Sequence, residues 1–359
     1  MVKNKARVFA LYLPQFHPIP ENDLWWGKGF TEWTNVGKAQ KMFRGHYQPR
    51  VPADLGYYDL RIPEVREEQA KLANEAGVEG FIYWHYWFGN GKRLMERPFD
   101  EVLSSGCPNF PFALAWANAT WKGFIYGDKG RNELISQEYP GEKDYIDHFN
   151  QLLTAFTDPR YIRIKDKPIF MIFQPFDLPE CDKFIKLWQE LSNKNGLNGI
   201  HFIAQTDDPS KIDELIRLGF SSVNLVRLFK PFNTENKAIK AIKKILTLIS
   251  GKNKNVKNYK ECMKFWTGPE DSKLQCIPSL FPNWDHSPRS GSKGIIIHGS
   301  TPELFEKHCH DVLAKIKNKP FDERIIILKS WNEWAEGNYM EPDLIFGKRY
   351  IKALGEALK

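Results

Sequence analysis

The sequence predicts an α/β fold, a (β/α)8 TIM barrel. Eight short apolar segments alternate with segments of helical periodicity along the 359 residues, and this alternation is typical of parallel strands joined by helices. Polar and aromatic residues directly follow seven of the eight apolar segments. In a barrel the carboxyl ends of all strands meet at one rim, where an active site lies. A doubly wound sheet is the alternative, but no phosphate-binding glycine loop follows the first strand.

Composition and charge indicate an ordinary globular domain. Hydrophobic residues make up 42% and charged residues 26% of the chain, and 359 residues are enough for a single large domain. Many of the 12 tryptophans stand beside polar residues, which suits carbohydrate binding. Much of the net charge of +7 lies in a lysine-dense stretch at 236–264, and such a local patch does not indicate nucleic acid as a partner. We therefore expect one catalytic domain, residues 1–359.

The amino terminus predicts neither an export signal nor a membrane anchor. Its apolar run, 8–13, is ended by Pro14 and is too short for a signal peptide. No other run approaches the length of a transmembrane helix. Five scattered cysteines without a C-x-x-C motif predict neither a disulfide framework nor a zinc site, and they fit a reducing compartment. We therefore expect a cytoplasmic protein with no integral membrane segment.

The strands and helices are expected in alternation from one end of the chain to the other. Short and nearly continuous apolar runs, typical of strands buried on both faces, predict strands at 7–13, 78–83, 112–116, 168–173, 200–204, 222–226, 276–280 and 325–328. The run at 222–226 is the weakest of them. Helical spacing of apolar residues predicts helices at 63–76, 144–156, 184–191, 212–218 and 302–316, with a short helix at the carboxyl end. Gly77 and Gly219 follow two of these helices, and Pro302 suits a first-turn position.

The segment 227–273, between the sixth and seventh strands, interrupts the alternation. It contains many lysines and one amphipathic helix, expected at about 238–249. We interpret it as an inserted Lys-rich helical segment or a long active-site loop within the single domain. Its lysines form either a solvated face or a contact with an anionic or membrane-associated substrate.

The stretch from 325 to 343 carries the strongest functional signal. After the apolar run 325–328 the composition changes to Trp331, Asn332, Glu333, Trp334 and Glu336. Carboxylates can supply acid and base, an amide can bind hydroxyls, and indoles stack on the apolar faces of sugars. The alternative is that both indoles are core residues that cap the barrel and both glutamates are solvated. We favour the catalytic interpretation because these five residues lie within six positions directly after a strand.

Glu333 and Glu336 are the expected catalytic pair. They are three positions apart, so a helical turn would place them on one face. Glycoside cleavage needs a proton donor at the leaving oxygen and a second carboxylate, which attacks, activates water or deprotonates a sugar hydroxyl. Glu32, between aromatic residues after the first strand, is either an alternative partner or a carboxylate bonded to backbone. No H-E-x-x-H spacing occurs, so we expect no catalytic metal and no cofactor.

Other polar and aromatic residues of the expected rim loops could bind an oligosaccharide or polysaccharide substrate. Some of the tryptophans are expected to pack the core and the rest to stack on sugars. Each histidine either binds a hydroxyl or is a satisfied structural residue. The candidate substrate-binding residues are Tyr12, Gln15, His17, Trp25, Trp26, Glu32, Trp33, Trp84, His85, Trp87, Trp116, Asn118, Gln174, Gln205, Trp284, Trp331, Asn332 and Trp334.

Three motifs resemble the WbsX family of bacterial polysaccharide-cluster proteins, namely YLPQFHPIPENDLWWGKGFTEWTNV (12–36), FIYWHYWF (81–88) and SWNEWAEGNYMEP (330–342). The resemblance spans nearly the whole chain, and the WbsX type is similar to glycoside hydrolase family 99, the endo-α-mannosidases and endo-α-mannanases. It implies a (β/α)8 barrel and a retaining, endo-acting hydrolase that forms a 1,2-anhydro sugar. Carried over here, Glu333 would deprotonate the 2-hydroxyl and Glu336 would be the general acid/base. Family 99 often has His where this chain has Ala335, so the subsite contacts are expected to differ.

Two further classes of function are open. The WbsX type is often labelled a glycosyltransferase of surface polysaccharide (O-antigen, lipopolysaccharide) biosynthesis. Against it, the chain contains no D-x-D motif, and a (β/α)8 barrel is not a usual sugar-nucleotide fold. A catalytically silent carbohydrate-binding module is the third class, and the presence of both glutamates weighs against it. The sequence therefore favours a glycoside hydrolase that cleaves α-mannoside-like linkages.

Overall fold

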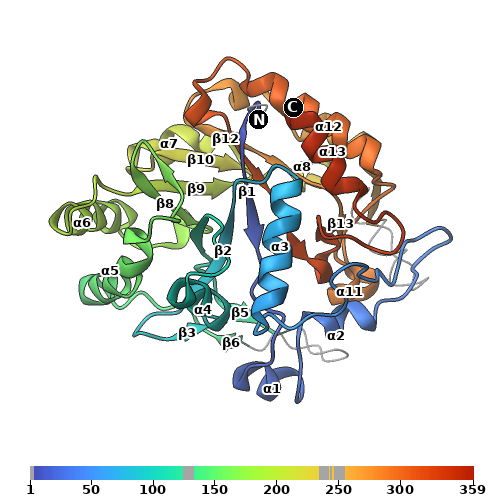
Figure 1. Cartoon of the computed structure of the whole chain (residues 1–359), viewed down its shortest axis with the longest axis horizontal. Coiled ribbons are helices and arrows are strands. Elements are labelled where there is room, and N and C mark those ends of the chain that lie inside the picture. Colours follow the sequence, from blue (N-terminus) through green and yellow to red (C-terminus); the bar gives the residue numbers. More distant parts are fainter. Residues whose placement is uncertain (1–3, 124–132, 234–241, 243–244, 246–254) are drawn as a thin grey trace.

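Eight parallel strands close into a barrel, which confirms the predicted fold (Figure 1). The computed structural model describes residues 4–123, 133–233, 242, 245 and 255–359. The barrel strands pair in the order β1-β15-β12-β10-β9-β8-β4-β2, and β1 pairs with β2 to close the ring. Their bounds are β1 (Arg7–Tyr12), β2 (Gly80–Trp87), β4 (Phe112–Trp116), β8 (Lys167–Ile172), β9 (His201–Thr206), β10 (Ser222–Leu225), β12 (Cys276–Leu280) and β15 (Ile325–Leu328).

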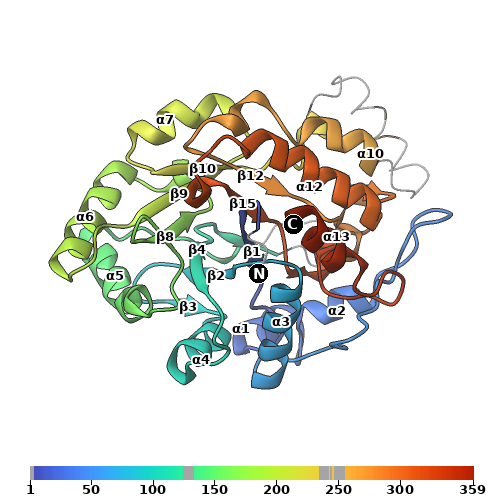
Figure 2. The same cartoon turned by 45° about the horizontal axis from the view of Figure 1, so that its top comes forward.

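Helices cover the outside of the barrel (Figure 2). The main ones are α3 (Pro63–Glu75), α4 (Arg97–Ser105), α5 (Glu142–Thr157), α6 (Cys181–Lys194), α7 (Ile212–Arg217), α12 (Pro302–Ile316) and α13 (Arg349–Leu358). Helix α4 is absent from the sequence-based expectations, although its buried residues Phe99 and Val102 have the three-residue spacing of a helix. The longest described helix, α5, has 16 residues, and none of the described helices combines the length and apolarity needed to cross a bilayer.

The boundaries predicted from the sequence agree closely with those of the structure for most strands and helices, and strand β2 is the exception. Strands β4, β12 and β15 and helix α12 begin and end where the sequence predicts. Strand β2 was expected to end at residue 83 but continues to Trp87. Trp84 and His85 pair in register with Ala115 and Trp116 of β4, and aromatic side chains suit such a pleated, buried surface. Four residues expected in a rim loop, 84–87, therefore lie in a strand.

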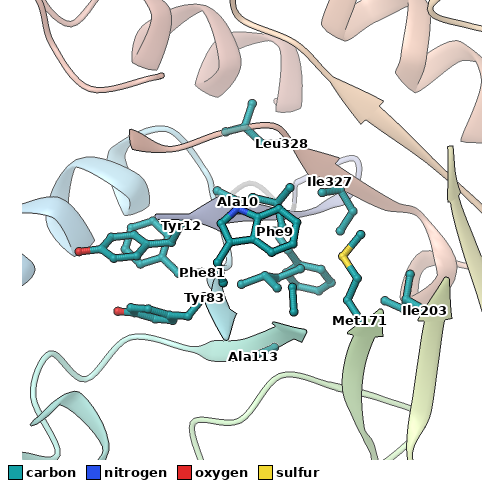
Figure 3. Packing of buried hydrophobic residues seen from close by; sticks show 14 of the residues in the cluster. Phe9, Ala10, Tyr12, Phe81, Tyr83, Ala113, Met171, Ile203, Ile327 and Leu328 are labelled. Atoms are coloured by element: carbon teal, nitrogen blue, oxygen red, sulfur yellow. The ribbon is translucent and has the colours of Figure 1, made fainter. Parts of the chain in front are cut away.

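Side chains alternate along the strands between the barrel interior and the surrounding helices. Figure 3 shows Phe9, Met171, Ile203 and Ile327, from four different strands, gathered in the interior, and all four are fully buried. Tyr83 lies on the outer face, where its ring contacts Phe99 of α4 at 5.4 Å between centroids. The interior is thus a packed core, and substrate access is confined to the ends of the strands.

The described ends of the 227–273 segment pack against the barrel. Arg227, which is fully buried, lies 2.8 Å from Asp271 and 3.0 Å from Glu270. This ion pair joins the first residues of the segment to its last ones. Around it an apolar cluster includes Leu228, Phe232, Tyr259, Trp266 and Phe281. The helix expected at 238–249 lies outside the described residues, so a role of the segment at the active site stays a prediction.

Candidate active site

A pocket of about 670 Å³ lies at the carboxyl ends of the strands. Its lining comes from β2 and from the segments that follow β1, β4, β8, β12 and β15, as a barrel rim requires. Helix α1 (Pro20–Trp26) and strand β5 (Trp121–Lys122) contribute an aromatic wall, in which the rings of Trp25 and Trp121 are 6.0 Å apart. Helix α2 (Glu32–Gly37) forms another side.

The motif after β15 folds into a tight hairpin that carries both glutamates. Strand β16 (Asn332–Glu333) pairs with β17 (Asn338–Tyr339), and the 3-10 turn η7 (Trp334–Glu336) lies between them. Gly337 has a φ of 53°, and a Cβ atom there would lie 2.7 Å from the Cβ of Asp285. A side chain at this position would be strained and would collide, so glycine is required for the turn. Both carboxyl groups consequently line the pocket from one hairpin.

Glu333 is a buried carboxyl group, 4% exposed. Trp84 donates its indole N–H to Oε1 at 2.9 Å, and the Nζ of Lys329 lies 3.2 Å from Oε2. Burial is the main cause that raises the pKa of Glu333, and the charge of Glu336 adds to it, while Lys329 acts against both. Glu333 is therefore the member of the pair that binds a proton more strongly.

The pKa of Glu336 is lowered, in contrast to that of Glu333, because a guanidinium contacts Glu336. Arg289 Nη1 lies 2.5 Å from Glu336 Oε1, and Arg289 Nη2 lies 2.9 Å from Glu32 Oε2. Burial alone would raise the pKa of Glu336, but Arg289, Lys329 and a hydrogen bond with Glu333 together lower it. The pair thus consists of one carboxyl group that favours a proton and one that favours ionisation, which is the composition that acid/base chemistry needs.

Replacing Trp84 with Phe is expected to reduce the fraction of Glu333 that is ionised and so able to accept a proton. The indole N–H favours the ionised form of Glu333, so its loss should raise the pKa of that carboxyl further. We expect kcat to fall about tenfold, the cost of one hydrogen bond to a charged group, with the acidic limb of the pH–rate profile displaced to higher pH. Trp121→Phe, in the same pocket, serves as the control. An unchanged acidic limb in Trp84→Phe would contradict the role of this contact.

A buried polar cluster positions helix α11 (Ser287–Ser290), which carries Arg289. Asp285 Oδ2 lies 2.7 Å from both His46 Nε2 and Gln48 Nε2, and its Oδ1 accepts the backbone N–H of Ser287 at 2.9 Å. Burial would raise the pKa of Asp285, but its hydrogen bond with His46 and other nearby groups lower it to about 2. An ionised carboxylate therefore anchors the start of α11 and, through it, Arg289.

The sequence-predicted residues that the structure brings together in the pocket come from three segments, namely the connection after β1, strand β2 and the hairpin after β15. They are Gln15, Trp25, Trp26, Glu32, Trp84, Glu333 and Glu336. Gln15 donates to the hydroxyl of Tyr86 at 3.2 Å. Glu32, the first residue of α2, is 4% exposed and contacts Arg289 rather than backbone.

Strand alternation directs another group of predicted residues away from the pocket and toward the outer helices. They are Tyr12, His85, Trp87 and Trp116, all of them buried. The Nε2 atoms of His85 and His148, on α5, are 2.8 Å apart, and Trp87 donates to Asp144 of the same helix at 3.0 Å. Burial lowers the pKa of His85 to about 3, so its ring is neutral. These residues pack the barrel against its helices.

The remaining predicted residues do not line the pocket. They are His17, Trp33, Asn118, Gln174, Gln205, Trp284, Trp331, Asn332 and Trp334. Asn332, for example, bonds the backbone N–H and C=O of Leu13 at 2.7 and 3.0 Å, and so connects the hairpin that carries both glutamates to the end of β1. The indoles of Trp331 and Trp334 are 0% and 1% exposed, so they are core residues, whereas the glutamates beside them line the pocket.

Among the pocket residues that are absent from the sequence-based selection are Arg289, Lys329 and Tyr86. Tyr86 could have been found by extending β2 and taking every second residue from Trp84. Lys329 directly follows the strand that precedes the catalytic motif. Arg289 carries no local signal, because its importance comes from contacts with two carboxylates that are far away in the sequence.

A further buried carboxyl group, Glu341, lies behind the hairpin that carries Glu333 and Glu336 and is 2% exposed. Its Oε2 accepts hydrogen bonds from Trp334 Nε1 at 2.6 Å and from the Tyr58 hydroxyl at 2.9 Å, and its Oε1 accepts one from Gln69 Nε2 at 2.6 Å. Among the described residues no cation forms an ion pair with it. Burial raises the pKa of Glu341 to about 7, although these donors act in the opposite direction.

Replacing Glu341 with Gln is expected to remove a pH-dependent loss of stability. A group whose folded-state pKa is raised stabilises fully below its unfolded pKa, here 4.5, and this stability is lost as the pH rises through about 7. Between pH 5.5 and 8.5 the wild type should lose roughly 2 kcal/mol of unfolding free energy through this group. Urea unfolding of wild type, Glu341→Gln and the exposed control Glu356→Gln at both pH values measures it. Equal pH dependence in all three would contradict the expectation.

Comparison with known sequences gives a consistent family match. The sequence model of the family described as glycosyltransferase WbsX matches residues 8–354. Two proteins of Xanthomonas campestris pv. campestris, from strains ATCC 33913 and B100, are described as uncharacterized protein WxcX and are 35% identical over 358 residues. The match covers 98% of this chain but 50% of each relative. The chain therefore spans about half the length of the curated relatives it matches.

Solved structures with the same architecture include glycoside hydrolases. A protein described as glycoside hydrolase-like is 17% identical with a TM-score of 0.64, over 100% of this chain and 95% of that one. The GH99 endo-α-mannosidase of Bacteroides thetaiotaomicron, in complex with bis-tris-propane, is 14% identical with a TM-score of 0.59, over 98% of this chain and 96% of that one. At these identities the likeness concerns the fold.

Proposed function

The chain belongs to the WbsX family, and we propose that it is a glycoside hydrolase that cleaves α-mannoside-like linkages within a polysaccharide. The observation that carries this proposal is the pair of unequal carboxyl groups on the catalytic hairpin. Glu333 favours a proton and Glu336 favours ionisation, and both line a pocket with an aromatic wall. Glycosidases require one acid and one base or nucleophile beside the sugar, and indoles supply stacking surfaces for sugar rings.

The proposed mechanism retains the anomeric configuration through a 1,2-anhydro sugar. Glu333 removes the proton of the 2-hydroxyl, O2 bonds to the anomeric carbon, and the bond to the leaving oxygen breaks as Glu336 donates a proton to it. Glu336, now ionised, then takes a proton from water, whose oxygen bonds to the anomeric carbon and opens the three-membered ring. Glu333 returns its proton to O2 in the same step. Each glutamate thereby regains its starting state.

In the free protein the proton affinities of the two glutamates run opposite to the roles proposed for them, and substrate binding must reverse this order. Burial raises the pKa of Glu333; burial would also raise that of Glu336, but Arg289 lowers it. Cleavage in the proposed sense requires a proton on Glu336. A hydrogen bond between the two carboxyl groups provides the path for the transfer. A sugar 2-hydroxyl that bonds to Glu333 favours its ionised form and so promotes the transfer.

Product analysis tests the proposal against the transferase suggested by the family description. Wild-type protein is incubated with α-mannans and bacterial O-polysaccharides without nucleotide sugar, and released oligosaccharides are separated and identified. We expect release, with the α-anomer formed first. Consumption of a nucleotide sugar in transfer to an acceptor, with no cleavage in its absence, would instead establish a glycosyltransferase. Glu356→Gln, an exposed substitution on α13, should behave as wild type in either case.

A further inference from the structure

The Glu341 cluster lies behind the proposed catalytic hairpin and connects three segments of the chain. We define it as Glu341, Trp334, Tyr58 and Gln69. Trp334 belongs to the catalytic turn, Tyr58 to the long connection between β1 and α3, and Gln69 to α3. All three donate to the two oxygens of the one carboxyl group, at 2.6 to 2.9 Å. The cluster is therefore a fixed point to which the hairpin is bonded from behind.

Both chain neighbours of Glu333 are connected to this cluster. Trp334, which follows Glu333, donates its indole N–H to Glu341 and stacks on Tyr339 at 3.7 Å between centroids. Asn332, which precedes Glu333, donates to the Tyr58 hydroxyl at 3.4 Å, and that hydroxyl donates in turn to Glu341. The backbone on either side of the catalytic carboxyl group is thus restrained through one buried side chain.

We propose that Glu341 is a positioning residue for Glu333 and that its ionised carboxylate is the form that positions. This inference rests on the proposed hydrolase function. An ionised carboxylate only accepts hydrogen bonds, as all three contacts require. Protonation of Oε1 would place an O–H against the amide N–H of Gln69, and protonation of Oε2 would either place one against the indole N–H of Trp334 or reverse the bond with the Tyr58 hydroxyl. Glu341 would then restrain the hairpin less, and Glu333 would be less well oriented.

Among the titratable groups that face one another in this cluster, Glu341 is the one that titrates near neutral pH. Tyr12 of β1 and Tyr58 face it, and burial raises the pKa of both phenols well above the usual value, so both stay neutral. The charge of Arg66, on α3, lowers the pKa of Tyr12 but does not outweigh burial, and the guanidinium of Arg66 forms an ion pair with Glu101. The pKa of Glu341, raised to about 7, therefore places the change between its two forms within the working range of an ordinary enzyme.

The first experiment follows tryptophan fluorescence between pH 5.5 and 8.5 and needs no substrate. The indole of Trp334 bonds directly to the titrating group, so the wild type should show a transition near pH 7. Glu341→Gln should lack it, because the amide does not titrate in this range. Trp334→Phe should show a smaller amplitude, and Glu356→Gln the full one. A wild type without a transition, or a Glu341→Gln variant that keeps it, overturns the inference.

The second experiment measures hydrolysis by Glu341→Gln across the same pH range. We expect kcat at least tenfold below wild type and KM changed less than threefold. Below pH 7 the variant should lose rate only through the titration of Glu333 and Glu336. Tyr58→Phe removes one bond and keeps the carboxylate, so kcat should fall by a smaller factor. Because the lost bond lowers the pKa of Glu341, the loss of rate on acidification should begin at a higher pH than in wild type. Tyr58→Phe also provides the test if Glu341→Gln does not fold.

The two experiments separate this inference from the proposed function. If wild type cleaves no glycan but shows the fluorescence transition that Glu341→Gln lacks, the proposed hydrolase fails while the ionisation of Glu341 stands. If wild type cleaves glycans and Glu341→Gln matches its kcat and pH profile, the positioning role is wrong and the hydrolase stands.

Discussion

Glu333→Gln and Glu336→Gln are each expected to lower kcat/KM for polysaccharide cleavage roughly thousandfold. Each substitution keeps the size of the side chain but removes a group that must bind and release a proton in every turnover. Both glutamates line the pocket, so KM should change little where binding uses other contacts. Released oligosaccharides are quantified over time for wild type, both variants and Glu356→Gln. Thermal unfolding of each protein confirms that the fold is intact.

Substrates with modified reacting groups distinguish the roles of the two glutamates. A leaving group that departs without a proton should restore the first step in Glu336→Gln but not in Glu333→Gln. A substrate that lacks the 2-hydroxyl should not be cleaved by any of the proteins, because O2 is the proposed nucleophile. If such a leaving group restores the first step in Glu333→Gln instead, Glu333 is the general acid and Glu336 is the base. Cleavage of the 2-deoxy substrate would exclude the 1,2-anhydro intermediate.

The barrel could be predicted from the sequence because its strands are buried on both faces. Such strands appear as short apolar runs, and β4, β12 and β15 have the bounds that these runs predict. Strand β2 was predicted to end four residues too early because its second half, Trp84 to Trp87, mixes aromatic residues with His85. Residues of that kind occur equally in rim loops, so only the pairing with β4 identifies them as strand.

The candidate catalytic pair could be predicted because Glu333 and Glu336 lie in one short motif, whose local composition indicates their chemistry without any knowledge of the fold. Arg289 and Glu32 come from the short helices α11 and α2, 257 positions apart. A contact of this kind is a property of the folded chain. The alternation along β2 is the intermediate case, since a correct strand boundary would have selected Tyr86 and excluded His85.

Arg289→Gln is expected to lower kcat/KM roughly a hundredfold at the wild-type pH optimum and to move that optimum to higher pH. Arg289 contacts Glu32 and Glu336 at once, and its charge lowers the pKa of Glu336. Without it, two carboxylates face each other across the pocket, and repulsion between them raises both pKa values. The singly protonated state that the reaction needs is then reached only at higher pH. A pH–rate profile from pH 4 to 9 measures the displacement.

Arg289→Lys is the matched variant, because it restores the charge without the fork of the guanidinium. A lysine ammonium is a point charge that cannot make the same paired contacts with two carboxylates. We expect a pH optimum close to that of wild type, because the lysine charge still lowers the pKa of Glu336. We expect a lower kcat, because Glu336 is less well oriented. If Arg289→Gln instead keeps the wild-type optimum, the ionisation of Glu336 does not control the rate. The acid would then have to be sought in Glu333, whose contacts with Trp84 and Lys329 are independent of Arg289.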